Sequence, residues 1–153
     1  MENIYGYARV STKEQKEDRQ VEALKEYGIK EENIFVDKIS GKDFNRPEYQ
    51  FIKELMKRTS NNILIIKSID RLGRNYKEIL QEWRELTHEL KVDIIILDMP
   101  LLDTTKFKDL LGTFISDLIL QVLSFVAEQE RKSIRQRQEE GIKIAKSKGK
   151  IFR

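Results

Sequence analysis

Residues 62–67, NILIIK, form an almost unbroken apolar run, and SIDRLGRN follows directly at residues 68–75. A short aliphatic, β-branched run bounded by polar segments is typical of a strand that is buried on both faces of a parallel sheet. The polar residues after it then lie at the carboxyl end of that strand. This junction predicts a central strand of an α/β fold with charged side chains at its exit.

Strand-like and helix-like segments alternate on both sides of this run. We predict further strands at residues 4–10, 33–37 and 92–97, and helices at residues 12–27, 47–58 and 76–91. Gly28 ends the first helix and Pro47 opens the second, while Thr12 and Gln15 have the spacing of a capping box. The alternation predicts a four- to five-stranded, mostly parallel sheet with helices on both faces.

Composition narrows the class of protein. The chain has 153 residues, of which 36% are charged and 39% are apolar in organised blocks, so we expect a globular domain. Because cysteine is absent and His88 is the single histidine, thiolate and histidine-rich metal sites are excluded, and a cytoplasmic location fits. We expect no signal peptide and no membrane span, since the apolar region 110–127 contains Asp117 and Gln121.

The last third of the chain predicts one or two helices between about residues 106 and 148. A single helix over residues 114–147 would be about 50 Å long. Its first half is apolar on nearly all faces, so one side can cover the sheet while the other needs a partner, most simply the same helix of a second chain. A second helix folded back over a monomer is the alternative.

The end of this helix is basic. Residues 128–153 contain nine Lys or Arg against four Glu, a net charge of +5, while the whole chain carries +3. Residues 1–127 therefore sum to −2, and the asymmetry predicts a polyanionic partner. A solvated helix face is the plainer interpretation.

Polar side chains converge at the predicted carboxyl edge of the sheet, where ligands of such folds bind. We expect Ser11 to be surrounded there by Arg9, Arg46, Arg71 and Arg74, with Asp70 among them. Guanidinium groups bind phosphate oxygens as forks and lower the cost of forming an alkoxide. The pattern predicts serine attack on a phosphate with no metal or cofactor. The structural alternatives are Ser11 as a helix cap and Arg9 as a salt-bridge partner of Asp37 or Asp70.

Four segments resemble the serine recombinase family of resolvases and DNA invertases. They are YARVSTKEQ at 7–15, SGKDFNRP at 40–47, SIDRLGRN at 68–75 and AEQERKSIRQRQEEGIKIAKSKGK at 127–150. The resemblance implies that Ser11 attacks a DNA phosphodiester, forms a 5′-phosphoserine link, frees a 3′-hydroxyl, and later rejoins strands without ATP. It implies a phosphate clamp of Arg9, Arg71, Arg74 and Arg46, with Asp70 transferring a proton or orienting an arginine. The remaining implied site residues are Tyr7, Gln15, Gln20 and, in support, Asp37.

The resemblance also implies partners: double-stranded DNA, a homodimer, and a synaptic homotetramer in which subunits exchange by rotation. The expected oligomer interface is Leu118, Val122, Phe125 and Val126. The expected DNA contacts are Arg131, Arg137, Lys143, Lys146 and Lys148. A bacterial, phage or mobile-element protein is implied.

Two features depart from the family pattern. The family usually continues into a helix-turn-helix domain, whereas this chain ends soon after Lys150, and Gln136 stands where a glutamate is common. We expect a catalytic domain at 1–112, a long helix at 113–149 and the start of a linker at 150–153, with the helix-turn-helix domain absent from this chain.

Two other functions compete with the recombinase. Asp37, Asp70 and Asp98 all follow predicted strands, as a magnesium-dependent phosphotransfer site would require. A non-catalytic oligomerisation module that binds DNA through its basic end would need no nucleophile.

Overall fold

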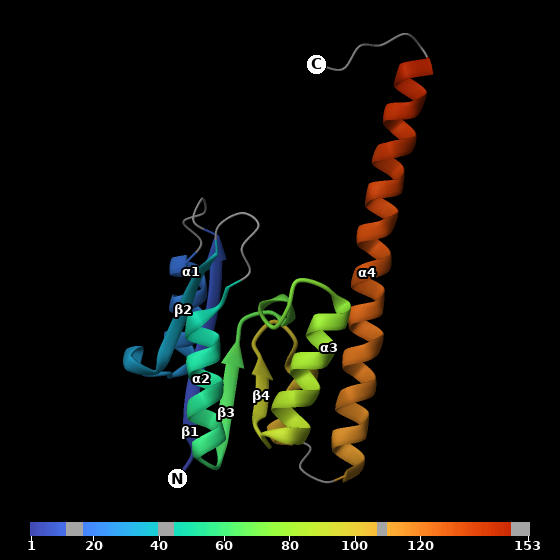
Figure 1. Cartoon of the computed structure of the whole chain (residues 1–153). Helices are drawn as coiled ribbons and strands as arrows, with labels where there is room; N and C mark the ends of the chain where they lie inside the picture. The colour runs from blue at the N-terminus through green and yellow to red at the C-terminus, as the bar shows by residue number, and fades with distance from the viewer. Residues whose placement is uncertain (12–16, 40–44, 107–109, 148–153) are drawn as a thin grey trace.

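The computed structural model describes residues 1–11, 17–39, 45–106 and 110–147, with the backbone alone at residues 11, 17, 18, 39, 110–113 and 127. The strands are β1 (Asn3–Ser11), β2 (Ile34–Ile39), β3 (Asn62–Ile66) and β4 (Asp93–Ile96). They form one parallel four-stranded sheet in the order β2-β1-β3-β4 (Figure 1). The predicted α/β fold is confirmed. Because the chain passes from β1 to β2 on one side and then to β3 on the other, the strand order reverses between β1 and β3.

Helices cover both faces of this sheet. On one face, Leu24 of α1 (Glu17–Tyr27) packs against Ala8 and Ile65. On the other, Ile52 of α2 (Pro47–Arg58) and Trp83 of α3 (Tyr76–Arg84) belong to a cluster with strand residues such as Leu64 (Figure 1). Successive residues of β3 alternate between the two clusters, and all five are buried, as the apolar run predicted.

Local signals set most helix ends. Gly28 follows α1 with a φ of +113°, a left-handed conformation that side chains other than glycine adopt at a cost. Pro47 is the first residue of α2. Asn75 caps α3, because its side-chain oxygen accepts the N–H of Glu78 at 2.9 Å. The predicted capping box of Thr12 and Gln15 lies outside the described residues.

The predicted helix at 76–91 is corrected at its end. The α-helical part of α3 ends at Arg84, and Glu85–Glu89 forms a π-helical turn in which the N–H of Leu90 donates to the carbonyl of Glu85 at 2.9 Å. Apolar periodicity cannot reveal such a turn, because a single extra residue per turn leaves most of the pattern intact. The turn brings His88 to the next helix.

That next helix, α4 (Leu110–Ser147), is one continuous element of 38 residues, about 57 Å long at 1.5 Å per residue. Ser116, Leu120 and Ser124 share the face that is buried against the domain. Asp117 anchors this part of the helix, since it accepts the Trp83 indole N–H at 2.9 Å and lies 2.8 Å from His88 Nε2. Beyond this contact α4 extends well past the other elements (Figure 1).

The opposite face of the first half of α4 is apolar and exposed. Phe114, Leu118, Val122 and Phe125 are each at least half exposed. The monomer alternative requires a second helix that folds back over this face. In the described parts of the chain, no element does so. The described helices include none long and apolar enough to cross a membrane.

Asp37 connects the sheet to the helix that follows. This carboxylate is 2% exposed near the end of β2. It accepts hydrogen bonds from the Tyr7 hydroxyl at 2.8 Å and from the N–H groups of Glu48 and Tyr49 at 2.9 and 3.0 Å. Asp37 therefore accepts hydrogen bonds from N–H groups at the start of α2 that have no partner within the helix. It also fixes the start of α2 against β1, and Arg46 directly precedes that start.

We expect Asp37→Asn to lower the free energy of unfolding by roughly 1.5–3 kcal/mol, because the amide offers one acceptor oxygen and turns an NH₂ group toward donors. Urea denaturation followed by circular dichroism measures the change. Asp98→Asn is the matched control, since it removes only an exposed 3.3 Å pair with Lys67 and should cost about 0–1 kcal/mol. Equal losses in the two variants would contradict the anchoring role of Asp37.

Candidate active site

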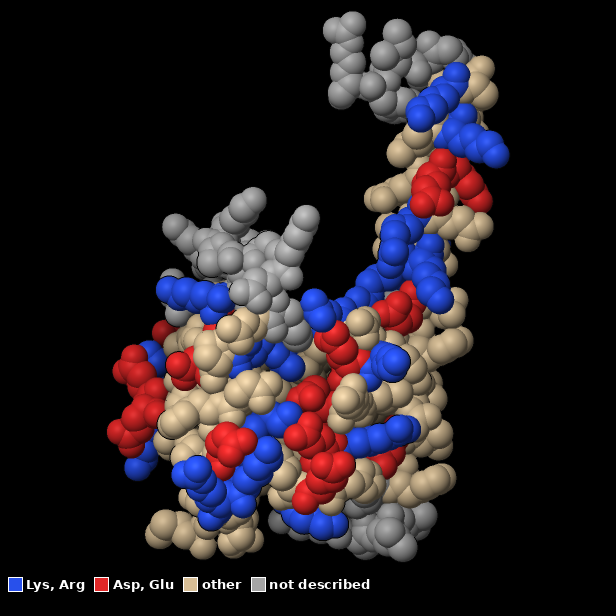
Figure 2. Space-filling model, in the orientation of Figure 1, with Lys and Arg blue, Asp and Glu red and all other residues tan. Residues whose placement is uncertain are grey.

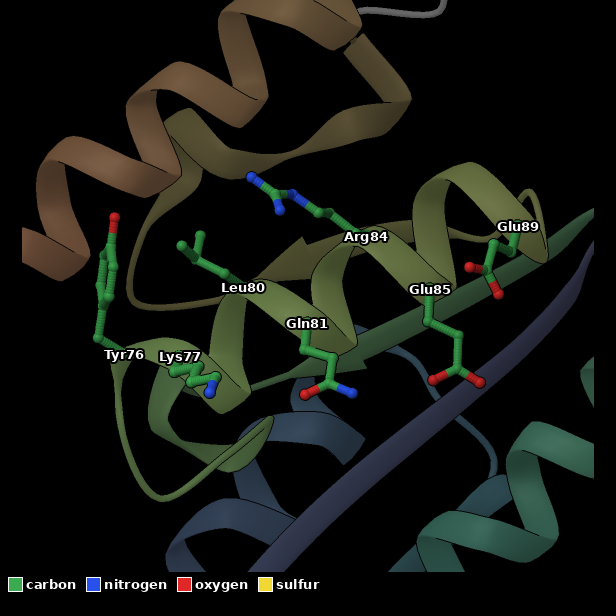
Figure 3. A pocket seen from close by; sticks show the side chains of 7 residues that line it. All are labelled: Tyr76, Lys77, Leu80, Gln81, Arg84, Glu85 and Glu89. Carbon is green, nitrogen blue, oxygen red and sulfur yellow. The ribbon is translucent and has the colours of Figure 1, made fainter.

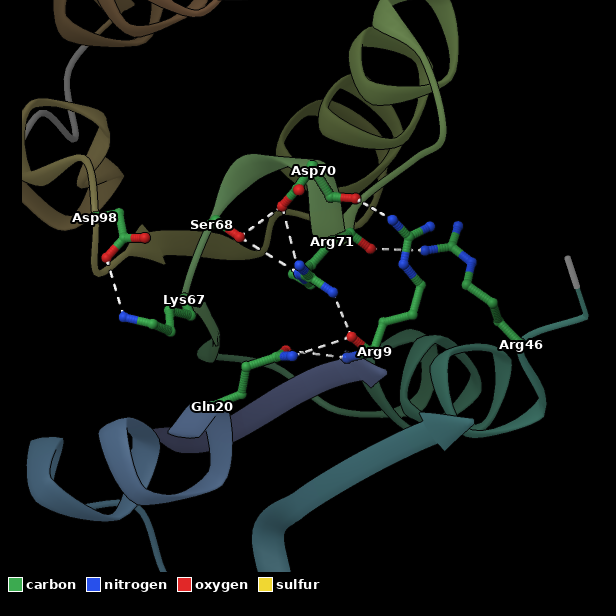
Figure 4. A network of polar contacts seen from close by, with 8 residues as sticks. All are labelled: Arg9, Gln20, Arg46, Lys67, Ser68, Asp70, Arg71 and Asp98. Atoms are coloured by element: carbon green, nitrogen blue, oxygen red, sulfur yellow. Dashed lines mark hydrogen bonds and ion pairs between the residues drawn. The ribbon is translucent and has the colours of Figure 1, made fainter. Parts of the chain in front are cut away.

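Three arginines from distant segments meet at the carboxyl edge of the sheet, where the strand order reverses. Arg9 lies in β1, Arg46 directly precedes α2, and Arg71 ends the short 3₁₀ turn Ile69–Arg71 after β3. Arg9 Nη2 donates to the carbonyl of Asp70 at 2.7 Å, and Arg46 Nη1 donates to the carbonyl of Arg71 at 3.0 Å (Figure 4). Arg71 Nη1 in turn donates to the carbonyl of Arg9. The three residues thus hold one another through main-chain oxygens, and we call them the arginine cluster.

The cluster concentrates positive charge, because a carbonyl accepts a hydrogen bond without neutralising the guanidinium. Burial lowers the pKa of Arg9 below its ordinary value, and the positive charges of Arg71 and Arg46 lower it further. Arginine nevertheless remains protonated at neutral pH. A bound anion with several oxygens would relieve this repulsion, so the geometry suits a phosphate group.

Arg46 is the most enclosed member of the arginine cluster. It is 7% exposed, and its Cζ lies 4.0 Å from the centroid of the Tyr49 ring, within cation–π distance. Tyr49 is itself fixed, because its hydroxyl donates to Glu82 of α3 at 2.6 Å and Lys53 pairs with the same carboxylate at 3.0 Å. The packing of α2 against α3 therefore supports the position of Arg46.

Gln20 and Tyr7 lie behind the cluster. The Gln20 amide forms a two-way contact with the main chain of Arg9, accepting its N–H at 3.2 Å and donating to its carbonyl at 3.1 Å. Tyr7 is fully buried and donates to Asp37. Burial raises the pKa of the Tyr7 phenol well above its ordinary value, and the Asp37 carboxylate raises it further. Gln20, Tyr7 and Asp37, all predicted site residues, thus form contacts that hold β1 near its carboxyl end.

Asp70 and Arg74 lie beside the arginine cluster and have different partners. The Asp70 carboxylate accepts a hydrogen bond from the Ser68 hydroxyl and lies 3.3 Å from Arg71 Nε. Arg74 Nη2 pairs with Glu78 at 3.0 Å, and these hydrogen bonds lower the pKa of Glu78 below its usual range. Arg74 is thus held on the first turn of α3, whereas Arg9, Arg46 and Arg71 contact one another's segments. Toward Asp70, Arg9 donates a hydrogen bond to the main-chain carbonyl.

The side chains of two predicted site residues are not described. β1 ends at Ser11, whose Cα pairs with that of Ile39, but the Ser11 side chain lies outside the described part of the chain. Gln15 lies outside the described residues altogether. The structure therefore places the backbone of Ser11 two residues after Arg9, at the edge where the arginine cluster lies.

The three aspartates of the magnesium alternative have separate partners. Asp37 is buried beneath Tyr7, Asp70 lies beside Arg71, and Asp98 pairs with Lys67. Within the described ranges, no three His, Cys, Asp or Glu side chains form a group that could hold a metal ion. Among the described residues, the geometry thus gives this alternative no ligand set.

A surface pocket of about 580 Å³ lies elsewhere, along α3 (Figure 3). Tyr76, Leu80 and Arg84 project from one side of the helix there, and Gln81 and Glu85 from the other. No member of the arginine cluster lines this pocket. We therefore do not take it as the active site.

Gly73 has a role that sequence reasoning missed. A Cβ atom at this position would lie 2.7 Å from Glu78 Cβ and 2.9 Å from the main-chain nitrogen of Ile79. The segment between Arg71 and Arg74 can therefore pack against the first turn of α3 only if residue 73 has no side chain. The signal was present in DRLGR, as a glycine just before a helix start.

Comparisons with known proteins agree on one family. The family model described as the resolvase N-terminal domain matches residues 4–151. The transposon Tn3 resolvase of Escherichia coli is 35% identical over 149 residues, which cover 97% of this chain and 75% of that protein. The transposon Tn917 resolvase of Enterococcus faecalis is 34% identical over 147 residues, covering 96% and 73%.

A solved structure is similar as well. The N-terminal catalytic domain of TP901-1 integrase matches with a TM-score of 0.59 and 26% identity, covering 84% of this chain and 96% of that one. A parallel α/β sheet with an arginine cluster at its switch point, and a family match over almost the whole chain, define the class. The chain belongs to the resolvase family and is a serine recombinase catalytic domain, an enzyme of site-specific recombination that cleaves and rejoins DNA.

We expect Gly73→Ala to lower the free energy of unfolding by about 1–3 kcal/mol, since the new methyl group overlaps α3. Gly141→Ala is the control: a Cβ there meets nothing within 4 Å, and on a helix it should stabilise by roughly 0.5–1 kcal/mol. Chemical denaturation of both variants measures the difference. Unchanged stability of Gly73→Ala would refute the close contact as a constraint.

Proposed function

We propose that Ser11 is the nucleophile of this recombinase and that the arginine cluster binds the DNA phosphate it attacks. The observation that carries the proposal is the joint position of Arg9, Arg46 and Arg71 at the edge where β1 ends at Ser11. Each guanidinium group donates a hydrogen bond to a carbonyl oxygen, and arginine stays protonated at neutral pH. Charge that builds up on phosphoryl oxygens in the transition state is stabilised most by such fixed donors.

The chemistry is a reversible exchange of phosphodiesters. The Ser11 hydroxyl gives up its proton as its oxygen forms a bond to phosphorus, and the bond from phosphorus to the 3′ oxygen breaks. That oxygen leaves as a hydroxyl and takes up one proton, so no net proton is gained or lost. The product is a 5′-phosphoserine, which keeps a phosphodiester bond. A 3′-hydroxyl of another strand can then attack the same phosphorus and release the serine, so rejoining needs no ATP and no metal ion.

The other site residues have supporting roles in this proposal. Asp70 orients Arg71, a role supported by their 3.3 Å contact, rather than acting as the proton carrier. Gln20, Tyr7 and Asp37 support β1 and α2. Arg74 joins the clamp by leaving Glu78 when DNA is bound, and Gln15 completes the site.

The distal half of α4 is proposed as the DNA-binding arm. Lys and Arg side chains follow this projecting helix, interspersed with Glu (Figure 2). Arg131, Arg137, Lys143 and Lys146 lie on its exposed part, and Lys148 lies outside the described residues. Gln136 donates to Glu140 at 3.3 Å, so the position where a glutamate is common contacts a carboxylate here. Phosphate contacts of this kind give affinity without sequence specificity.

The exposed apolar face of α4 is proposed to bind a second copy of the chain. Leu118, Val122, Phe125 and Val126 are exposed in the single chain, and a stripe of this size on a soluble helix usually contacts a partner. A homodimer in solution and a homotetramer on DNA follow from this proposal. We also propose a division into a catalytic domain at residues 1–112 and a long helix expected at residues 113–149, which the structure describes as α4 over Leu110–Ser147. We place the protein in the cytoplasm, together with DNA.

A non-catalytic DNA-binding module is the second candidate, favoured only by the basic arm. It predicts retained function without Ser11, so one substitution separates the two.

We expect Ser11→Ala to abolish the covalent protein–DNA adduct while unfolding stability stays within about 1 kcal/mol of the wild type. The measurement uses end-labelled, nicked duplexes of randomised sequence and scores label that stays on protein in denaturing gels. Ser60→Ala, at the opposite edge of the sheet, is the control and should form the adduct normally. An adduct on the Ser11→Ala variant would remove Ser11 from this role.

We expect Phe125→Asp to weaken self-association by at least about thirtyfold, because it places a charge in the centre of a desolvated apolar contact. Analytical ultracentrifugation over a concentration series measures the change. Ile142→Asp, which alters an exposed apolar residue farther along the same helix, should leave self-association intact. Identical sedimentation of Phe125→Asp and wild type would argue against this interface.

A further inference from the structure

Ser68 lies between the central strand and the active-site turn, yet it does not perform the usual task of a serine in that place. It directly follows Lys67 at the exit of β3 and is the N-cap residue of the turn Ile69–Arg71. Serine at an N-cap ordinarily accepts a main-chain N–H with its side chain. The Ser68 side chain forms no capping hydrogen bond. Its hydroxyl is therefore available for another purpose.

The hydroxyl instead contacts two site residues. Ser68 Oγ donates to Asp70 Oδ1 at 2.5 Å and accepts from Arg71 Nε at 3.3 Å (Figure 4). The same Asp70 oxygen lies 3.3 Å from Arg71 Nε. On its other edge, the Arg71 guanidinium donates from Nη1 to the carbonyl of Arg9. Arg71 is thus held at two points, one set by Ser68 with Asp70 and one set by β1.

The hydroxyl also limits how Asp70 and Arg71 can pair. A carboxylate and a guanidinium left to themselves favour a two-pronged ion pair, which is stronger and more fully compensates the charge. Ser68 binds the same Asp70 oxygen that lies 3.3 Å from Arg71 Nε, so the hydroxyl and the guanidinium compete for that oxygen. Arg71 Nη1 meanwhile donates to the main chain of Arg9.

We propose that Ser68 is a positioning residue of the recombination reaction: its hydroxyl sets the orientation of Arg71 and keeps the Arg71 charge available to the DNA phosphate. The inference rests on the proposed function, because it assumes that the arginine cluster binds the scissile phosphate. Donors fixed before the reaction stabilise the transition state without a cost of reorganisation. Losing the hydroxyl allows Arg71 to turn onto Asp70.

The test compares Ser68→Ala with Ser68→Thr, which keeps the hydroxyl. The substrate is the pool of end-labelled, nicked duplexes used for the Ser11→Ala measurement, at saturating concentration in a single turnover. We expect Ser68→Ala to slow adduct formation by about tenfold to a hundredfold, as a misplaced binding group does, and Ser68→Thr to recover most of the rate. DNA affinity should stay unchanged in both variants, since the arm of α4 lies elsewhere.

Stability distinguishes positioning from a purely structural role. Because Ser68 makes no capping bond, and its short contact with Asp70 is exposed to solvent, Ser68→Ala should melt within a few degrees of the Ser60→Ala control. A wild-type rate in Ser68→Ala would overturn the inference, and so would a Ser68→Thr variant as slow as Ser68→Ala. Either result leaves the proposed function intact as long as the wild-type protein still forms the adduct. If the wild type itself formed no adduct, the proposed function and this inference would both fall.

Discussion

The arrangement of this protein depends on main-chain carbonyls that hold guanidinium groups at the switch point of a parallel sheet. Arg9, Arg46 and Arg71 come from segments that are far apart in the sequence, and each is fixed by an oxygen of another's segment. Carbonyl oxygens fix the position of a guanidinium without adding a negative charge, which suits a site for a phosphate. The Asp70 carboxylate, 3.3 Å from Arg71 Nε, offsets part of the charge of Arg71.

This arrangement raises the energy of the empty site, and the surrounding structure offsets that cost. Like charges gather in a partly buried place, as the lowered pKa of Arg9 reflects. Beneath them, Asp37 ties β2 to the start of α2 and Tyr7, while the Tyr49 ring supports Arg46 and is fixed in turn by Glu82 of α3. These buried polar contacts therefore support the placement of Arg46 at the start of α2.

The long helix α4 combines two environments on one element. Its inner face is small and partly polar: Ser116 and Ser124 are buried without a hydrogen-bond partner for their hydroxyls, and Leu120 is the fully buried apolar residue between them. Its outer face carries larger apolar residues that are exposed. Asp117, held by Trp83 and His88, supplies the specific contact to the domain. Among the described side chains of α4, Ile119 and Leu123 also pack against the core, while several larger apolar residues are directed away from the domain.

The sequence alone determined the elements whose causes are local. Alternating apolar periods predicted the four strands and the helices between them, Gly28 and Pro47 marked two helix ends, and the order of strand exits indicated which polar residues share an edge. The tertiary structure alone decided the partners. Nothing local distinguishes Arg74, paired with Glu78, from Arg71, bonded to a strand 62 residues earlier, or shows that Ser68 contacts Asp70 instead of capping its turn. The apolar periodicity also gives no sign of the π-helical turn that brings His88 to Asp117. Periodicity is set by neighbours along the chain, whereas the partner of a charged side chain is set by which distant segments the sheet order brings together.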